Sequence, residues 1–157
     1  MASALVDTGF LVALGRKGDP LHGAARASFL REAGPLITVS PVIVETCHFL
    51  DAEAKIQLLD LAQSPRLRTL ELPVDAYGEV GAAIRKYADR DIDLADAALI
   101  WLANRADVRR ILTVDTADFS VYRLKGGKHF DVSQKWFGAM LKDIGQPMGR
   151  TTAVKHG

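Results

Sequence analysis

Short apolar runs alternate along the chain with longer segments in which apolar positions recur at helical spacing. The runs at residues 3–6, 36–39, 67–72 and 110–114 predict buried strands, and the residues near Phe130 predict a short edge strand. Segments of helical length lie between them, at residues 20–33, 41–50, 52–62, 74–88 and 94–105. Repeated alternation of strand and helix favours an α/β fold with a mainly parallel sheet and right-handed crossovers.

The start of one of these helices carries a local signal. Ser40 and Pro41 predict a helix start, with the Ser40 hydroxyl at the cap and Pro41 where a missing N–H group is tolerated. The two tryptophans, Trp101 and Trp136, have no array of neighbouring aromatic residues that would suggest base stacking, so we expect both to pack in the core.

The composition is that of one soluble domain. The chain has 157 residues, of which 48% are hydrophobic and 25% charged, values that allow a substantial core. The longest apolar run, residues 97–103, is too short for a membrane span, which needs about 18 residues. No basic stretch precedes the apolar residues 2–6, so we expect no secretory signal, and the single Cys47 is expected to be a core thiol in a reducing cytoplasm.

Charge is distributed unevenly, although the net charge is only +1. Residues 123–157 carry seven Lys or Arg against two Asp, while the rest of the chain has a net charge of −4. An acidic body with a basic tail is able to bind metal in one place and phosphate in another, and a solvated C-terminal extension is the other interpretation.

Carboxylates stand at the ends of two predicted strands. Asp7 follows the first strand and Asp115 follows the fourth, 108 positions later. Because ligand sites of parallel α/β sheets lie beyond the carboxyl ends of the strands, these two side chains can meet in one cleft. The alternative is that each caps the helix that follows it.

Glu45 lies on a largely apolar helix face, with Val42, Thr46 and Phe49 one turn away. An ionised carboxylate buried without a partner costs several kcal/mol, so such groups are usually paired with a cation or bound to a metal. A basic side chain from elsewhere in the chain, or a position at the rim of the core, would also account for Glu45.

Asp93 and Asp96 share one helix face at a spacing of three residues. A divalent cation between them would relieve their repulsion, and the alternative is that both favour the start of the helix electrostatically. Asp118 is a weaker candidate that could cap a short turn. Four or five acids at element ends, without a Cys/His cluster or zinc spacing among the histidines, suggest a hard cation held by oxygen, Mg²⁺ or Mn²⁺.

Four segments together carry a resemblance to a known family. They are Leu5-Val6-Asp7-Thr8, residues 40–45 (Ser-Pro-Val-Ile-Val-Glu), Asp93-Leu94-Ala95-Asp96-Ala97 and residues 112–119 (Leu-Thr-Val-Asp-Thr-Ala-Asp-Phe). In order and separation they resemble PIN domains, specifically VapC-type toxins of toxin–antitoxin modules. The resemblance covers about residues 4–131, and it implies that residues 1–131 are a PIN-like nuclease domain with a three-layer α/β/α fold. Residues 132–157 lie beyond it and are expected to be a basic C-terminal extension, loose from about residue 146.

The resemblance implies an activity and a set of site residues. The family's acidic quartet, which the resemblance implies to be catalytic and to hold the metal, falls on Asp7, Glu45, Asp96 and Asp115. Accessory acids fall on Asp93 and Asp118, and hydroxyls beside the site fall on Thr8 and Thr113. It implies a toxin that is a Mg²⁺-dependent endoribonuclease, with Mn²⁺ as a possible substitute, in which water attacks the phosphodiester. The expected products carry 5′-phosphate and 3′-hydroxyl ends. One acid, Glu45 or Asp93, is expected to orient the water.

Partners follow from the same resemblance. RNA is the expected substrate, and candidate phosphate contacts are Arg16, Lys17, Arg123, Lys125 and Lys128. A cognate antitoxin and a homodimer are also implied. The alternative function is a PIN-fold module that binds metal and RNA or a protein without cutting. A receiver-type phosphotransfer domain fits less well, because adjacent acids after the first strand and a lysine after a late strand are missing.

Overall fold

The structure is a computed structural model that describes residues 3–133 together with residues 136, 138 and 142. The expected loose segment from residue 146 onward lies outside the described residues.

A five-stranded parallel sheet forms the centre of the molecule. Its strands are β1 (Ala4–Val6), β2 (Leu36–Val39), β3 (Leu67–Leu70), β4 (Arg110–Leu112) and β5 (Asp131–Val132). Their spatial order is β3-β2-β1-β4-β5, and every neighbouring pair is parallel. The predicted strands are confirmed, although β3 and β4 each end two residues before the predicted boundary. The apolar runs arise because the central strands are buried on both faces.

The order of the strands reverses at β1. The chain moves from β1 to β2 and β3 on one side and then returns to place β4 and β5 on the other. The carboxyl ends of β1 and β4 therefore lie next to each other at a topological switch point, where open α/β sheets bind ligands.

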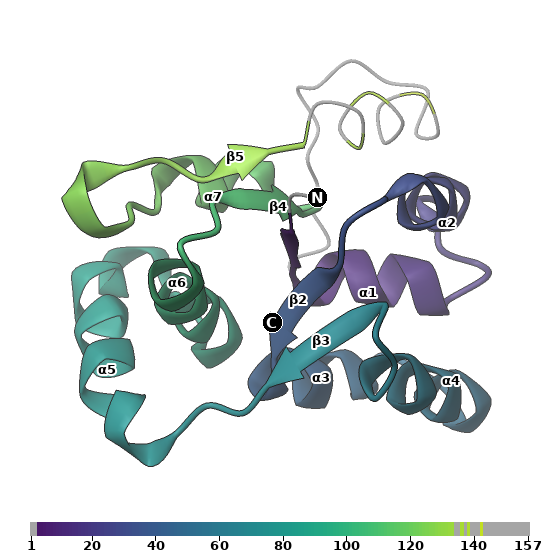
Figure 1. The fold of residues 1–157 in the computed structure, drawn as a ribbon, viewed down its shortest axis with the longest axis horizontal. Coiled ribbons are helices and arrows are strands. Elements are labelled where there is room, and N and C mark those ends of the chain that lie inside the picture. The colour runs from purple at the N-terminus through teal and green to yellow at the C-terminus, as the bar shows by residue number, and fades with distance from the viewer. Residues whose placement is uncertain (1–2, 134–135, 137, 139–141, 143–157) are drawn as a thin grey trace.

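Helices cover both faces of the sheet, so the predicted three-layer α/β/α fold is confirmed. They are α1 (Thr8–Gly15), α2 (His22–Arg31), α3 (Ser40–Cys47), α4 (Ala52–Ala62), α5 (Tyr77–Lys86), α6 (Leu94–Ala106) and α7 (Thr116–Val121). Figure 1 shows α5 and α6 on one side of the sheet and α1, α2 and α4 on the other. Short 3₁₀ turns at Val74–Ala76 and Ala88–Arg90 flank α5, so the helix predicted at 74–88 is three elements.

The cap predicted at Ser40 is wrong. The helix α3 begins at Ser40 itself, and the cap position is Val39, which has an extended backbone and no side-chain cap bond. The Ser40 hydroxyl instead accepts a hydrogen bond from the backbone N–H of Leu72 at 3.4 Å. The hydroxyl is used to join α3 to the segment after β3, while Pro41 does lie in the first turn as predicted.

The core extends beyond residue 131. β5 includes Val132, and Trp136 is fully buried against Phe10, with ring centroids 5.0 Å apart in an edge-to-face arrangement. The Trp136 ring N–H donates to the Thr113 carbonyl oxygen at 2.6 Å, so the packing role predicted for this residue is confirmed. Within the described part of the chain, every helix is too short or too polar to cross a membrane.

Candidate active site

Three acids of the site are the N-cap residues of helices. Asp7 follows β1 and caps α1, where its Oδ1 accepts a hydrogen bond from the N–H of Phe10 at 3.0 Å. Asp115 caps α7 by accepting from the N–H of Asp118 at 3.1 Å, and Asp93 caps α6 by accepting from the N–H of Asp96 at 2.8 Å. The capping alternative is therefore confirmed, and capping also fixes the orientation of each carboxylate at the site.

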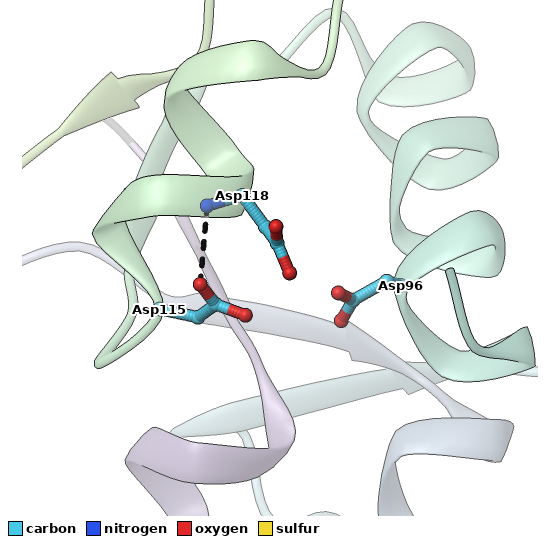
Figure 2. Close-up of side chains that lie close together, drawn as sticks. All are labelled: Asp96, Asp115 and Asp118. Atoms are coloured by element: carbon cyan, nitrogen blue, oxygen red, sulfur yellow. Dashed lines mark hydrogen bonds between the residues drawn. The ribbon is translucent and has the colours of Figure 1, made fainter. Parts of the chain in front are cut away.

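Three buried carboxylates converge beyond the carboxyl ends of the central strands. Asp96, Asp115 and Asp118 each offer an oxygen, and these oxygens all lie within 4.8 Å of one another. Figure 2 shows Asp96 reaching from α6 toward Asp115 and Asp118, which belong to the cap and first turn of α7. We call these three residues the carboxylate cluster.

Thr113 connects the end of β1 to the end of β4. Its hydroxyl donates to Oδ2 of Asp7 and accepts from the N–H of Asp115 at 2.9 Å. The two strand-end acids therefore lie at the same edge of the sheet, as the parallel arrangement predicted. Asp7 lies beside the carboxylate cluster rather than in it.

Burial and crowding make Asp7 hard to ionise. Desolvation is the largest cause and raises its pKa from 3.8 to about 7. The hydrogen bonds from Thr113 and Phe10 lower this pKa, and the charges of Asp115 and Asp93 raise it. Asp7 therefore changes protonation near neutral pH.

The pKa of Asp96 is raised as well. Burial raises its pKa well above the ordinary value, and the charges of Asp93, Asp7 and Asp115 raise it further. The Tyr122 hydroxyl donates to Oδ2 of Asp96 at 3.1 Å and lowers this pKa. So many carboxylates interacting at close range favour either bound protons or a bound cation.

Glu45 lies at the margin of this group, half-buried on α3. Its pKa is raised, mainly by desolvation and also by the charge of Asp93, while Thr8 and His48 lower it. The Thr8 hydroxyl is buried and lies close enough to Glu45 to lower the pKa of that carboxyl, although it does not reach full hydrogen-bond geometry with any described residue. It is the one such side-chain atom found among the described residues, and it stands next to the Asp7 cap.

The donor set fits a hard divalent cation. The carboxylate cluster supplies oxygen ligands, which Mg²⁺ and Mn²⁺ prefer. Of the quartet drawn from the resemblance, Asp96 and Asp115 are in the cluster and Asp7 and Glu45 lie outside it. Asp118, which the resemblance implied to be an accessory acid, is the third member of the carboxylate cluster.

Two further residues contact the cluster and were not predicted. Tyr122 holds Asp96, and the guanidinium of Arg90 contacts Asp118 through Nη2 at 2.9 Å and Nε at 3.2 Å. Arg90 belongs to the polar connection before α6, and its only signal in the sequence is its position three residues before Asp93.

The five basic residues predicted to contact RNA lie in different places. Arg16 and Lys17 are exposed after the end of α1, the opposite end from Asp7, and line a cavity of about 540 Å³. Arg123 donates to three backbone carbonyl groups at the end of α7, so its guanidinium is used in closing that helix. Nζ of Lys125 lies 3.9 Å from Oε1 of Glu79, and the Lys128 side chain is exposed.

The fold and the site together define a class of protein: three-layer α/β/α proteins that hold buried carboxylates at the switch point of a parallel sheet. The PIN domain family matches residues 4–124. The chain is 35% identical to ribonuclease VapC26 of Mycobacterium tuberculosis over 138 residues, which cover 82% of this chain and 98% of that protein. It is 30% identical to the 23S rRNA-specific endonuclease VapC20 of M. tuberculosis over 121 residues, covering 77% of this chain and 81% of the relative.

The solved structures agree in fold. The crystal structure of M. tuberculosis VapC20, described as a sarcin–ricin loop cleaving toxin, superposes with a TM-score of 0.68 at 21% identity. The superposition covers 73% of this chain and 91% of that one. The chain therefore belongs to the PIN domain family and, within it, to the VapC proteins, as its motifs suggested.

Proposed function

We propose that this chain is a divalent-metal-dependent endoribonuclease that acts as the toxin of a toxin–antitoxin module. The observation that carries the proposal is the buried carboxylate cluster at the switch point of a PIN fold. Relatives named as a ribonuclease and an rRNA endonuclease support RNA as the substrate. Such an activity would operate in the cytoplasm.

The carboxylate cluster would hold the cation, with Asp7 beside it. We propose Mg²⁺ as the natural ion and Mn²⁺ as a substitute, because both take carboxylate oxygen ligands. When bound, such an ion lowers the pKa of a water molecule and stabilises negative charge on the leaving oxygen.

The residues of the chain itself supply orientation and proton handling. Thr113 holds Oδ2 of Asp7 and the N–H of Asp115, so it sets the spacing between the two strand ends. Asp7, with a pKa of about 7, can hold or release a proton at neutral pH. Glu45, half-buried and beside the Thr8 hydroxyl, is our choice for orienting the attacking water.

The proposed partners are RNA, an antitoxin and a second copy of the chain. Arg16, Lys17 and Lys128 keep exposed cationic groups and are the better candidates for phosphate contacts. Co-expression with a neighbouring open reading frame is expected to relieve growth arrest. Light scattering of the purified chain tests the homodimer.

The function is tested with purified protein, freed from any bound partner, and labelled total RNA. We expect discrete fragments with 5′-phosphate ends in Mg²⁺ or Mn²⁺ and none in EDTA. Asp96→Asn is expected to reduce cleavage by at least about 100-fold, because it removes a charge from the cluster. Asp60→Asn, an exposed position on α4, is the matched control and should cleave like the wild type.

Three results would refute the proposed function. Cleavage that persists in EDTA, or products with 2′,3′-cyclic phosphate ends, would exclude water activated at a metal. Binding of Mn²⁺ and RNA without cleavage of any RNA tested would instead support the non-cleaving module.

A further inference from the structure

Arg90 joins the turn before α6 to the acidic residues of α7. It is the last residue of the Ala88–Arg90 turn, and its partner Asp118 lies 28 positions later in the sequence. Both Nε and Nη2 donate to the same atom, Oδ1 of Asp118, at 3.2 and 2.9 Å. The pair is partly shielded from solvent, since the Arg90 and Asp118 side chains are 34% and 10% exposed.

The geometry of this pair bears directly on the carboxylate cluster. Asp118 belongs to α7, a helix of only six residues, and its carboxylate lies close to two others of the same charge. Repulsion from Asp96 and Asp115 favours rotation of the Asp118 side chain away from them. Two donors on one oxygen oppose that rotation and add a positive charge at the edge of the cluster.

We propose that Arg90 is a positioning residue that holds the Asp118 carboxylate in the orientation in which the cluster binds a divalent cation. The inference rests on the proposed function, because it concerns the same site. A carboxylate that serves a metal is usually held by a hydrogen-bonding partner behind it, and loss of such a partner typically reduces metal affinity 10- to 100-fold. Arg90 contacts Asp118 in the way expected of such a partner, because both of its donors bond to one carboxylate oxygen.

Arginine and lysine differ at this position in a measurable way. The planar guanidinium presents Nε and Nη2 together, whereas a lysine ammonium is a single point charge on a flexible stem. If orientation of Asp118 is the role of Arg90, Arg90→Lys should retain only part of the cation affinity. If charge alone matters, Arg90→Lys should behave like the wild type.

The test is titration calorimetry of the metal-free full chain with Mn²⁺. We expect Arg90→Gln to weaken Mn²⁺ binding by about 10- to 100-fold and Arg90→Lys to lie between Arg90→Gln and the wild type. The matched control is Arg110→Gln, which breaks the ion pair with Glu32 at the start of β4. That pair is comparably exposed, with side chains 29% and 12% exposed, but lies at the other end of the strand from the cluster.

A double-variant cycle shows whether Arg90 acts through Asp118. In the Asp118→Asn background, Arg90→Gln should cause little further loss of Mn²⁺ affinity, because the carboxylate it would orient is absent. Circular dichroism of each variant checks the fold, and Arg90→Lys, which keeps the charge, provides a folded variant if Arg90→Gln is unstable.

The outcomes separate this inference from the proposed function. Tighter Mn²⁺ binding by Arg90→Gln would mean that Arg90 competes with the cation, and unchanged binding would mean that the ion pair serves stability alone. Equal affinity of Arg90→Lys and the wild type would show that charge alone matters. Each result overturns the inference while leaving the nuclease proposal intact. Failure of the wild type to bind Mn²⁺ would overturn both.

Discussion

Gly9 stands where α1 passes closest to the end of β4. A Cβ atom at this position would lie 2.2 Å from Cγ2 of Val114, and Val114 is only 4% exposed. Carbon atoms in ordinary contact are about 3.5–4 Å apart, so the added methyl group would overlap Val114 by more than about 1 Å. Gly9→Ala must therefore displace Val114, and because this side chain is buried we expect α1 and the residues after β4 to move apart. Asp7 lies two residues before Gly9 and Asp115 directly follows Val114, so we expect the two acids to move apart as well.

The expected loss of stability can be worked from two opposing contributions. Overpacking of a well-packed core costs about 1–3 kcal/mol. Replacing glycine by alanine within a helix contributes up to about 1 kcal/mol in the other direction. We therefore expect Gly9→Ala to lower the free energy of unfolding by about 1–2 kcal/mol in urea denaturation. Its Mn²⁺ affinity and RNA cleavage should fall as well.

Two companion variants identify the clash as the cause. Val114→Ala removes the overlapping methyl group, so Gly9→Ala should be neutral or stabilising in that background. Gly81→Ala, in the middle of α5, has no atom within 4 Å of the added Cβ and should stabilise the protein by up to about 1 kcal/mol without changing Mn²⁺ affinity. Gly9→Ala with wild-type stability and cation affinity would refute the reasoning that this contact sets the spacing of the site.

Two further predictions concern Asp7. Thr113→Val should raise the pKa of Asp7 above about 7, because the lost hydrogen bond lowers that pKa, and the pH dependence of Mn²⁺ binding should move to higher pH; an unmoved profile would contradict it. Asp7→Asn should stabilise the metal-free protein at pH 8 and not at pH 4. Ionisation of Asp7 opposes folding increasingly as the pH rises from the unfolded pKa of about 3.8 to the folded pKa of about 7, and fully above it, by at most about 4 kcal/mol. Urea denaturation in EDTA across this pH range measures the difference, and a difference independent of pH would exclude Asp7 as its source.

The sheet could be predicted because its signal is local. Buried parallel strands are continuous apolar runs, and the runs that became β1 and β2 stand out clearly from the polar sequence around them. The helix α1 was not among the predicted helices for a related reason. Phe10, Leu11, Val12 and Ala13 are all buried, so α1 has no polar face and shows no helical period.

The site could be predicted only in part, because its contacts depend on distant segments. The strand-end positions of Asp7 and Asp115 follow from the parallel sheet, and the spacing of Asp93 and Asp96 follows from one helix. Asp118 stands in the same relation to Asp115 as Asp96 does to Asp93, so this spacing was a usable signal. Arg90 had no such signal, because its contact spans 28 positions and depends on the packing of α7 near α6.

Capping and chemistry are not competing roles for these acids. The N-cap bond of Asp7, Asp93 and Asp115 uses one oxygen to satisfy a backbone N–H, and the positive end of each helix favours the negative charge. Asparagine keeps the capping oxygen and removes the charge, whereas alanine removes both and loses about 1 kcal/mol of capping energy. At Asp115, the Asn variant therefore tests the site and the difference between Asn and Ala measures the cap. If both variants lose cation binding equally while only Ala loses stability, the two roles belong to the same carboxylate and are energetically separate.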